Sequence, residues 1–89
     1  MDTYVVICTF KADTEMDEVF AVVAEEQAQV KILEDEGRIG SIHLSLARGT
    51  VFLEIFAESE AGAEETVRTL PMAKWWDLDV YPVAGPPQG

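Results

Sequence analysis

One carboxylate interrupts an apolar stripe in the first half of the sequence. Glu26 lies in the middle of this stripe, so a helix through the segment points its side chain towards the protein interior. Burial raises the pKa of a carboxylic acid towards neutrality, which suits a general base that accepts a proton and returns it. Alternatively, Glu26 bends to the helix edge or forms a hydrogen bond in an oligomer contact. The apolar residues at helical spacing around it are Val19, Val23, Val30 and Leu33.

The single histidine is the second candidate for acid–base chemistry. His43 alternates with Ser41 and Ser45 in a strand-like run, so these three side chains share one face. Imidazole titrates near neutral pH, and a histidine that lines a cavity can therefore act as an acid or a base. The alternative is a structural or interface role. Glu54, in the following strand-like run, is expected on a shared face, where it either pairs with His43 or forms an intersubunit hydrogen bond.

Four further residues have side chains suited to binding a substrate. Gln27 flanks the stripe of Glu26 and can donate a hydrogen bond to a carbonyl oxygen, and Arg48 can bind a carboxylate through its guanidinium. Trp75 and Trp76 open the last strand-like run, where alternation predicts one ring on each side of a sheet and one ring in a pocket wall. The simpler interpretations are solvated edge and turn residues for the polar pair and core or interface filling for the tryptophans.

The spacing of apolar residues predicts the elements that position these side chains. The resulting order, β-α-β-β-α-β, indicates an α+β protein of ferredoxin-like topology, with an antiparallel four-stranded sheet and two helices on one face. Pro82 favours an edge position for the last strand. We expect a single domain at 1–84 and a flexible tail at 85–89. In chain order, the expected elements are a strand at 3–10, a helix from 13 or 14 to Gly37, strands at 39–47 and 50–58, a helix at 60–70 and a strand at 75–83.

The sheet face without helices is predicted to be too apolar to stay in water. Phe52 and Phe56 share this face with Glu54, and 48% of all residues are hydrophobic, a high fraction for a chain of 89 residues. A second copy packed face to face would cover it and form a dimeric α/β barrel. Such barrels contain cavities that suit small organic ligands. We therefore expect a homodimer or larger ring that binds a small-molecule substrate.

Composition argues against several other classes of protein. The chain has 17 acidic and 6 basic residues, a net charge of -11 that repels nucleic acids and anionic membrane surfaces. The single cysteine, Cys8, excludes an internal disulfide, and we expect a cytoplasmic protein. One histidine and one cysteine argue against a metal site, and phosphate-binding glycine loops are absent, so the sequence predicts no metal and no cofactor.

Several segments together resemble the muconolactone isomerase family. They are Glu36 to Arg38 at the end of the first helix, Leu70-Pro71 after the second, and the last strand from Asp77 to Val83. The resemblance implies a cofactor-free isomerase of a small unsaturated lactone in aromatic catabolism, with a ferredoxin-like fold assembled into dimers and larger rings. Within such an enzyme, Glu26 would carry a 1,3-proton shift, and His43 or Gln27 would polarise the carbonyl.

The chain departs from the family pattern close to Glu26. The family is basic around this glutamate, whereas here Glu25 precedes it and Gln27 follows, so a cationic partner is missing. His43 and Ile39 occupy positions where the family has aromatic residues, which implies a different pocket. Two alternatives therefore stay open. One is a polyketide cyclase or cofactor-independent monooxygenase on the same barrel, which needs a larger cavity, and the other is a non-catalytic ligand-binding or assembly module.

Overall fold

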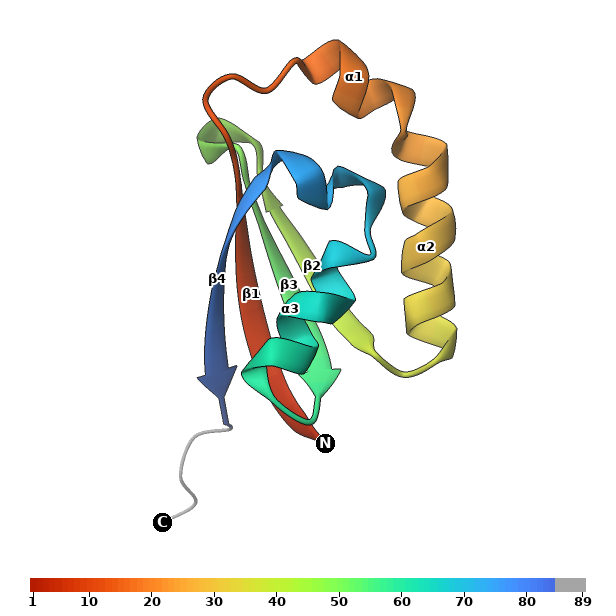
Figure 1. Ribbon diagram of the computed structural model, residues 1–89, viewed down its shortest axis with the longest axis vertical. Coiled ribbons are helices and arrows are strands. Elements are labelled where there is room, and N and C mark those ends of the chain that lie inside the picture. The colour runs from red at the N-terminus through yellow and green to blue at the C-terminus, as the bar shows by residue number, and fades with distance from the viewer. Residues whose placement is uncertain (85–89) are drawn as a thin grey trace.

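A computed structural model of the chain describes residues 1–84 and shows four strands, three α-helices and two short 3-10 helices (Figure 1). The predicted tail at 85–89 lies outside the described residues. The elements are β1 (Asp2–Phe10), α1 (Met16–Ala21), α2 (Val23–Asp35), β2 (Ile39–Ser45), η1 (Leu46–Arg48), β3 (Thr50–Ala57), α3 (Glu60–Arg68), η2 (Pro71–Trp75) and β4 (Trp76–Val83).

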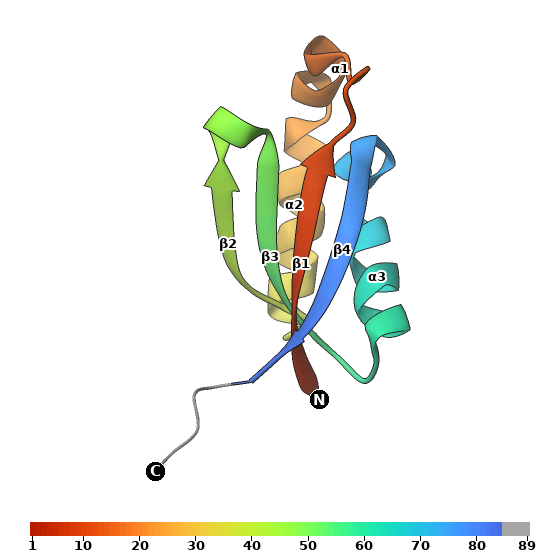
Figure 2. The same cartoon turned by 90° about the vertical axis from the view of Figure 1, so that its left-hand side faces the viewer.

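The four strands form one antiparallel sheet in the order β2-β3-β1-β4. The helices lie on one face of it (Figure 1), and Figure 2 looks onto the other face, which we call the open face. This arrangement confirms the predicted ferredoxin-like α+β fold, and β4 occupies an edge as Pro82 indicated. The central strands β1 and β3 carry β-branched and aromatic residues, which favour a strand conformation with neighbours on both edges.

The hydrophobic core lies between the sheet and the helices. Alternate residues of β3 are buried, and its remaining residues are half-buried on the open face. Leu33 of α2 and Val67 of α3 are fully buried against the helix-facing side of the sheet. The strand residues of this core are Tyr4, Val6, Cys8, Ile39, Val51, Leu53, Ile55, Ala57 and Trp76.

The first helix is broken, contrary to the continuous helix predicted up to Gly37. It consists of α1 and α2, separated at Val22, whose backbone angles are φ -109° and ψ 12°. The break lies between two adjacent β-branched residues, Val22 and Val23, which lowers helix propensity locally. Thr14 does not cap α1, because its hydroxyl donates to the Lys11 carbonyl (2.6 Å). As a consequence, α1 departs from the direction of α2 and passes above the end of the sheet (Figure 1).

Two predicted helix boundaries are confirmed by their hydrogen bonds. Gly37 follows α2 with a left-handed φ of 71°, and its N–H donates to the Glu34 carbonyl (3.0 Å). The Arg38 N–H donates to the Leu33 carbonyl (2.9 Å), which completes a Schellman motif. At the start of α3, the Ser59 hydroxyl oxygen accepts from the Gly62 N–H (3.1 Å), as expected of an N-cap.

The last strand begins one residue later than predicted. Trp75 belongs to η2, which starts at Pro71, and only Trp76 lies in β4. The prediction that the two tryptophans point to opposite sides of one strand is therefore wrong. Proline fixes its own φ and suits the first position of a helical turn, so the chain turns once more before it enters β4.

Two glycines, Gly37 after the end of α2 and Gly62 within α3, provide a matched test of backbone conformation. Gly37→Ala should lower the free energy of unfolding by about 1–2 kcal/mol, because an alanine is strained at a positive φ even in open space. Gly62→Ala should raise it by about 0.5–1 kcal/mol, because Gly62 lies within α3 and an added Cβ meets only ordinary van der Waals contacts. Urea unfolding measures both, and shifts of the same sign would contradict this account.

Candidate active site

Glu26 lies on α2 and faces η2. Its side chain is half-buried, and its Oε1 accepts a hydrogen bond from the Met72 backbone N–H (2.9 Å). The two residues are 46 positions apart in the sequence. This bond therefore fixes α2 against η2, the short 3-10 helix that follows α3. In the part of the chain that the structure describes, no hydrogen bond occupies the second carboxylate oxygen.

The environment of Glu26 favours its protonated form. Burial raises the pKa of the Glu26 carboxyl above its ordinary value, and the hydrogen bond from Met72 opposes this in part. The charge of Glu26 also acts on β1. The pKa of the Cys8 thiol is raised to about 12, first by burial and then by the negative charge of Glu26. The carboxylate thus lies between α2, η2 and the middle of the sheet, and Cys8 stays a protonated core residue.

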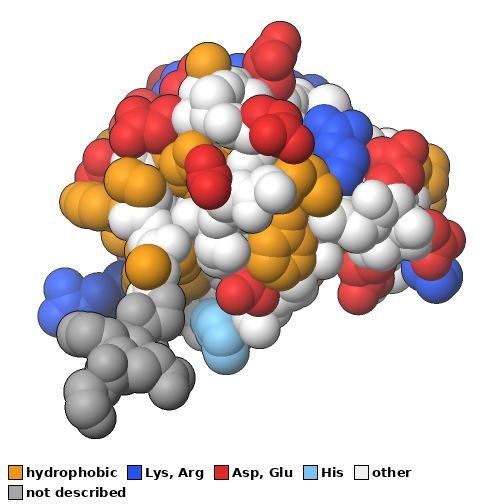
Figure 3. All heavy atoms as spheres, turned by 90° about the horizontal axis from the view of Figure 1, so that it is seen from below, with side chains coloured by type: hydrophobic (Ala, Val, Ile, Leu, Met, Phe, Trp, Pro, Cys, Tyr) orange, Lys and Arg blue, Asp and Glu red, His pale blue; other side chains and the backbone are white. Residues whose placement is uncertain are grey.

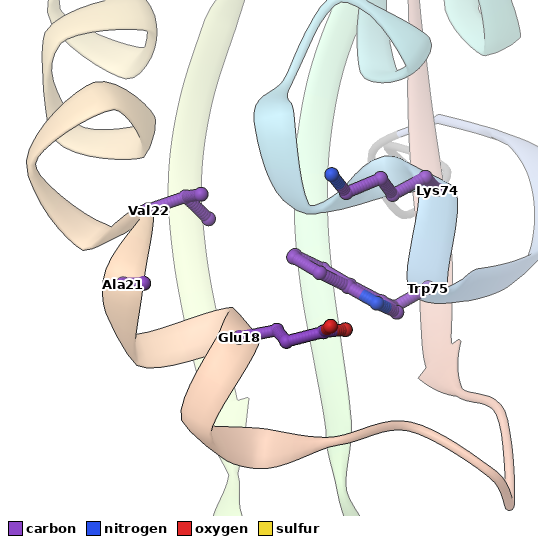
Figure 4. A pocket seen from close by; sticks show the side chains of 5 residues that line it. All are labelled: Glu18, Ala21, Val22, Lys74 and Trp75. Atoms are coloured by element: carbon purple, nitrogen blue, oxygen red, sulfur yellow. The ribbon is translucent and has the colours of Figure 1, made fainter.

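A pocket of about 420 Å³ opens between the α1–Val22 segment and η2, one helical turn before Glu26 (Figure 4). Its volume falls in the range of small-molecule sites. The Glu26 N–H donates to the carbonyl of Val22 (2.9 Å), which lines this pocket one helical turn earlier. One wall of the pocket is α1 with Val22, and the other is η2, which also donates the hydrogen bond to Glu26. The lining residues are Glu18, Ala21, Val22, Lys74 and Trp75.

Trp75 and Lys74 form the η2 side of this pocket. The Lys74 Nζ lies 4.5 Å from the centroid of the Trp75 ring, within the range of a cation–π contact. Figure 4 shows the Trp75 ring between the side chains of Lys74 and Glu18. Trp75 thus lies where a pocket wall was predicted, whereas sequence reasoning missed Lys74. Its only sequence signal is its place next to Trp75, because nothing in the spacing shows that η2 packs against α2.

A second, smaller hollow lies on the open face of the sheet. It measures about 200 Å³, and His43 and Glu54 contribute to its lining. His43 is exposed and lies opposite Phe52 in the β2–β3 ladder. The Glu54 Oε1 accepts from the Ser41 N–H (3.0 Å), within the irregular part of β2 between Ile39 and Ile42. Glu54 thus supports the backbone of an edge strand, and no hydrogen bond between Glu54 and His43 is present among the described residues.

The structure divides the predicted site residues between different layers. Glu26 and Trp75 lie on the helix side of the sheet, whereas His43 and Glu54 lie on the open face. The sheet itself therefore separates Glu26 from His43 within one subunit. Two other predicted ligand contacts, Gln27 and Arg48, are exposed and line neither hollow.

Trp76 is a core residue. It is buried, and its ring packs edge-on against Phe10 with centroids 5.9 Å apart and an interplanar angle of 78°. Its Nε1 has no hydrogen-bond partner in the described chain. Of the two tryptophans, Trp75 is the one that lines the pocket of about 420 Å³.

The sequence was compared with models of known protein families. The model described as muconolactone delta-isomerase matches residues 3–88, nearly the whole chain of 89 residues. The chain belongs to the muconolactone delta-isomerase family. This confirms the predicted resemblance and, at the level of the family, an isomerase-like function. No individual curated protein matches the chain.

Two further observations concern metals and membranes. Within residues 1–84, no three side chains of His, Cys, Asp or Glu gather in a way that could hold a metal ion. None of the described helices combines the length and the apolar character needed to cross a membrane.

The raised pKa of Glu26 predicts that the free energies of unfolding of the parent and of Glu26→Gln differ by an amount that depends on pH. Because its pKa is raised, folded protein keeps the Glu26 proton to a higher pH than the unfolded chain, for which 4.5 is the ordinary value. As the pH rises through this interval, ionisation of Glu26 lowers the free energy of unfolding. The variant, whose amide oxygen can still accept from Met72, should therefore gain stability relative to the parent as the pH rises above 4.5, until Glu26 is ionised in the folded parent as well.

Urea unfolding at several pH values measures this difference. The control for the loss of one negative charge is Glu25→Gln, because Glu25 is the exposed neighbour on the same helix. If the free energies of unfolding of the parent and of Glu26→Gln differed by the same amount at every pH, the raised pKa of Glu26 would be contradicted.

Proposed function

We propose that this protein is a cofactor-free isomerase that moves a proton within a small unsaturated lactone, with Glu26 as the proton carrier. The observation that carries the proposal is the half-buried carboxyl of Glu26, which is bonded to η2 one helical turn from a pocket of about 420 Å³. Membership of the muconolactone delta-isomerase family supports the reaction type. The identity of the lactone is part of the proposal, because the family match supports only the type of reaction.

One carboxylate is sufficient for the proposed 1,3-shift. Glu26 removes a proton from the γ carbon of an α,β-unsaturated lactone, and the electron pair moves through the conjugated system onto the carbonyl oxygen as a dienolate. Return of the same proton to the α carbon moves the double bond to the β,γ position. No atom is gained or lost, and no oxidant or reductant is needed. A carboxyl whose pKa is raised is suited to both steps, because its carboxylate is a stronger base than an ordinary glutamate and its protonated form can return the proton.

The surroundings of Glu26 support this role. The Met72 N–H holds Oε1 in a fixed direction (2.9 Å), which leaves the other oxygen to exchange the proton. Val22 and Trp75 place half-buried apolar side chains on the nearby pocket.

Family membership favours a lactone over the alternative substrates of the same barrel. The pocket of about 420 Å³ is large enough for a monocyclic lactone. Proton exchange followed by NMR, compared between the parent and Glu26→Gln, distinguishes an isomerase from a non-catalytic module.

We propose in addition that two copies of the chain pack through their open faces. Val5, Ile7, Phe52 and Phe56 are only half-buried there, and Tyr81 of β4 is 48% exposed. A second sheet would remove these side chains from water. In Figure 3, which views the molecule from below, orange hydrophobic side chains reach the surface between red acidic ones.

The isomerase proposal is tested with muconolactone in deuterated buffer. The parent should exchange or move ring protons, as followed by NMR, and Glu26→Gln should lose at least about a hundredfold in rate because an amide cannot carry the proton. Glu25→Gln removes the same charge from the exposed neighbouring position and should keep the activity. Equal behaviour of the parent and Glu26→Gln would favour a non-catalytic module.

His43→Gln belongs in the same experiment. Glu26 and His43 lie on opposite faces of the sheet, so the proposed mechanism leaves the proton transfer to Glu26. Retained turnover in this variant supports that mechanism. Lost turnover in His43→Gln together with retained turnover in Glu26→Gln would place the reaction on the open face.

The assembly proposal predicts that Phe52→Asp dissociates the oligomer. Sedimentation velocity should show a smaller species, because a carboxylate in the middle of the open face would be buried without a partner. Phe20→Asp is the matched control, since Phe20 is 66% exposed on α1, away from the open face. Circular dichroism confirms that both variants fold. Dissociation of the Phe20 variant alone would show that the copies meet on the helix side.

A further inference from the structure

We infer that Gln29 is a positioning residue for Glu26. Its hydrogen bond to Thr69 holds α2 at the distance from η2 at which the Met72 N–H reaches the Glu26 carboxylate. The effect of Gln29 on turnover rests on the proposed function, whereas its effect on the geometry of Glu26 does not. Three observations carry the inference: the order of the contacts between the two segments, the exposure of the half of α2 that carries Glu26, and the setting of the Thr69 hydroxyl.

The contacts of α2 with the segment from α3 to η2 follow an antiparallel order. As the residue numbers rise along α2, those of the bonded partners fall, as expected of two segments that lie side by side in opposite directions (Figure 1). The bonds therefore align the two segments with each other. From one end to the other, they are Met72 N–H to Glu26 Oε1 (2.9 Å), Gln29 Nε2 to Thr69 Oγ1 (3.0 Å), and Arg38 Nη2, just after α2, to Thr66 Oγ1 (2.7 Å).

Gln29 and Glu26 form neighbouring bonds in this series. Gln29 lies one helical turn after Glu26 on the same face of α2, and Thr69 lies shortly before Met72. A single hydrogen bond would leave α2 able to tilt about it. A second bond one turn away fixes the tilt of the helix as well as its distance from η2. The direction of the Glu26 carboxylate therefore depends on both bonds.

The half of α2 that carries Glu26 is weakly anchored by apolar contacts. Among the described residues, Leu33 is the buried side chain of α2, and Val30 packs against the core while partly exposed. Both lie after Gln29 in the sequence. The preceding helix gives little support, because the chain breaks at Val22 between α1 and α2. The placement of the first turns of α2 therefore depends in large part on the polar contacts of Glu26 and Gln29.

The Thr69 hydroxyl is held ready to accept the bond from Gln29. It donates to the Thr66 carbonyl (2.7 Å), and this leaves the lone pairs of its oxygen to accept from the Gln29 amide. Its neighbours in the chain belong to the core, since Thr66 is 1% and Leu70 is 2% exposed. Although the bond itself is exposed, it therefore ties α2 to a fixed part of the protein.

Loss of this bond should disturb the geometry that the proposed reaction needs. Without it, the first half of α2 can pivot about Leu33, and the Glu26 oxygens then move relative to the Met72 N–H and the pocket. A general base acts only within hydrogen-bond reach of the proton that it removes. A displacement of about 1 Å can cost roughly a hundredfold in rate. Gln29 therefore acts on the reaction through Glu26.

The Met72 amide signal in NMR spectra tests the effect on geometry. Because this N–H donates to Glu26, its proton shift should follow the ionisation of Glu26 with pH, and Glu26→Gln should abolish that titration. In Gln29→Ala, the amplitude of the titration should fall at least about twofold, because the bond is formed for a smaller fraction of the time. The control is Lys31→Ala, which removes a hydrogen bond from α2 to Asp35 (2.8 Å) and should leave the amplitude unchanged.

Turnover of muconolactone tests the effect on the reaction. Gln29→Ala should lower kcat roughly tenfold, with KM changed by less than about twofold because Gln29 and Thr69 do not line the pocket. Thr69→Val removes the acceptor and should act alike, whereas Thr69→Ser retains the hydroxyl and should retain most of the rate. The double variant Gln29→Ala/Thr69→Val should be no slower than either single variant, because both remove the same bond.

The two measurements separate the role of Gln29 from the isomerase itself. An unchanged Met72 titration in Gln29→Ala would overturn the positioning role, whatever happens to the rate. A reduced amplitude with an unchanged kcat would overturn its part in the reaction. A reduced amplitude in a protein whose parent does not turn over muconolactone would retain the positioning of Glu26 and overturn the isomerase. Alanine favours helix formation, so Gln29→Ala should keep α2 folded, and circular dichroism checks this.

Discussion

The hydrogen bond between the Met72 backbone and the Glu26 carboxylate is the contact on which the candidate site depends. A half-buried carboxylate requires a donor, and the backbone of η2 provides one. In return, the bond holds η2 beside the α1–α2 segment, and the space between them is the pocket. Two segments that are distant in the sequence therefore approach each other here. Their approach determines the position of the carboxyl, the shape of the pocket, and the placement of Lys74 and Trp75.

Much of the fold follows from local patterns in the sequence. Apolar residues with strand character define β1 and β3, Gly37 ends α2 because only its left-handed backbone fits the turn, and Ser59 begins α3 through its hydroxyl. Each of these signals acts within a few residues, so one sequence is enough to show it. The orientation of Glu26 belongs to the same class, because helical periodicity alone places it towards the interior of the protein.

Other features depend on contacts that no local pattern reveals. The break at Val22 replaces one long helix by two, since the segment must follow both the core and the end of the sheet. Lys74 has no helical or strand periodicity that would mark it as a pocket residue. His43 and Glu26 each have a chemical character that suits catalysis, but only the register of β2 on β3 shows that they face opposite layers.

The division of the site between a helix and a 3-10 turn has an evolutionary consequence. Glu26 belongs to a helix that also contributes Leu33 to the core, so a mutation that shifts this helix affects both folding and the position of the carboxyl. Lys74 is exposed, and its neighbour Ala73 anchors η2 in the core. Related chains can therefore exchange the residue at position 74 with little loss of stability, and the charge on this wall of the pocket can change while Glu26 stays in place.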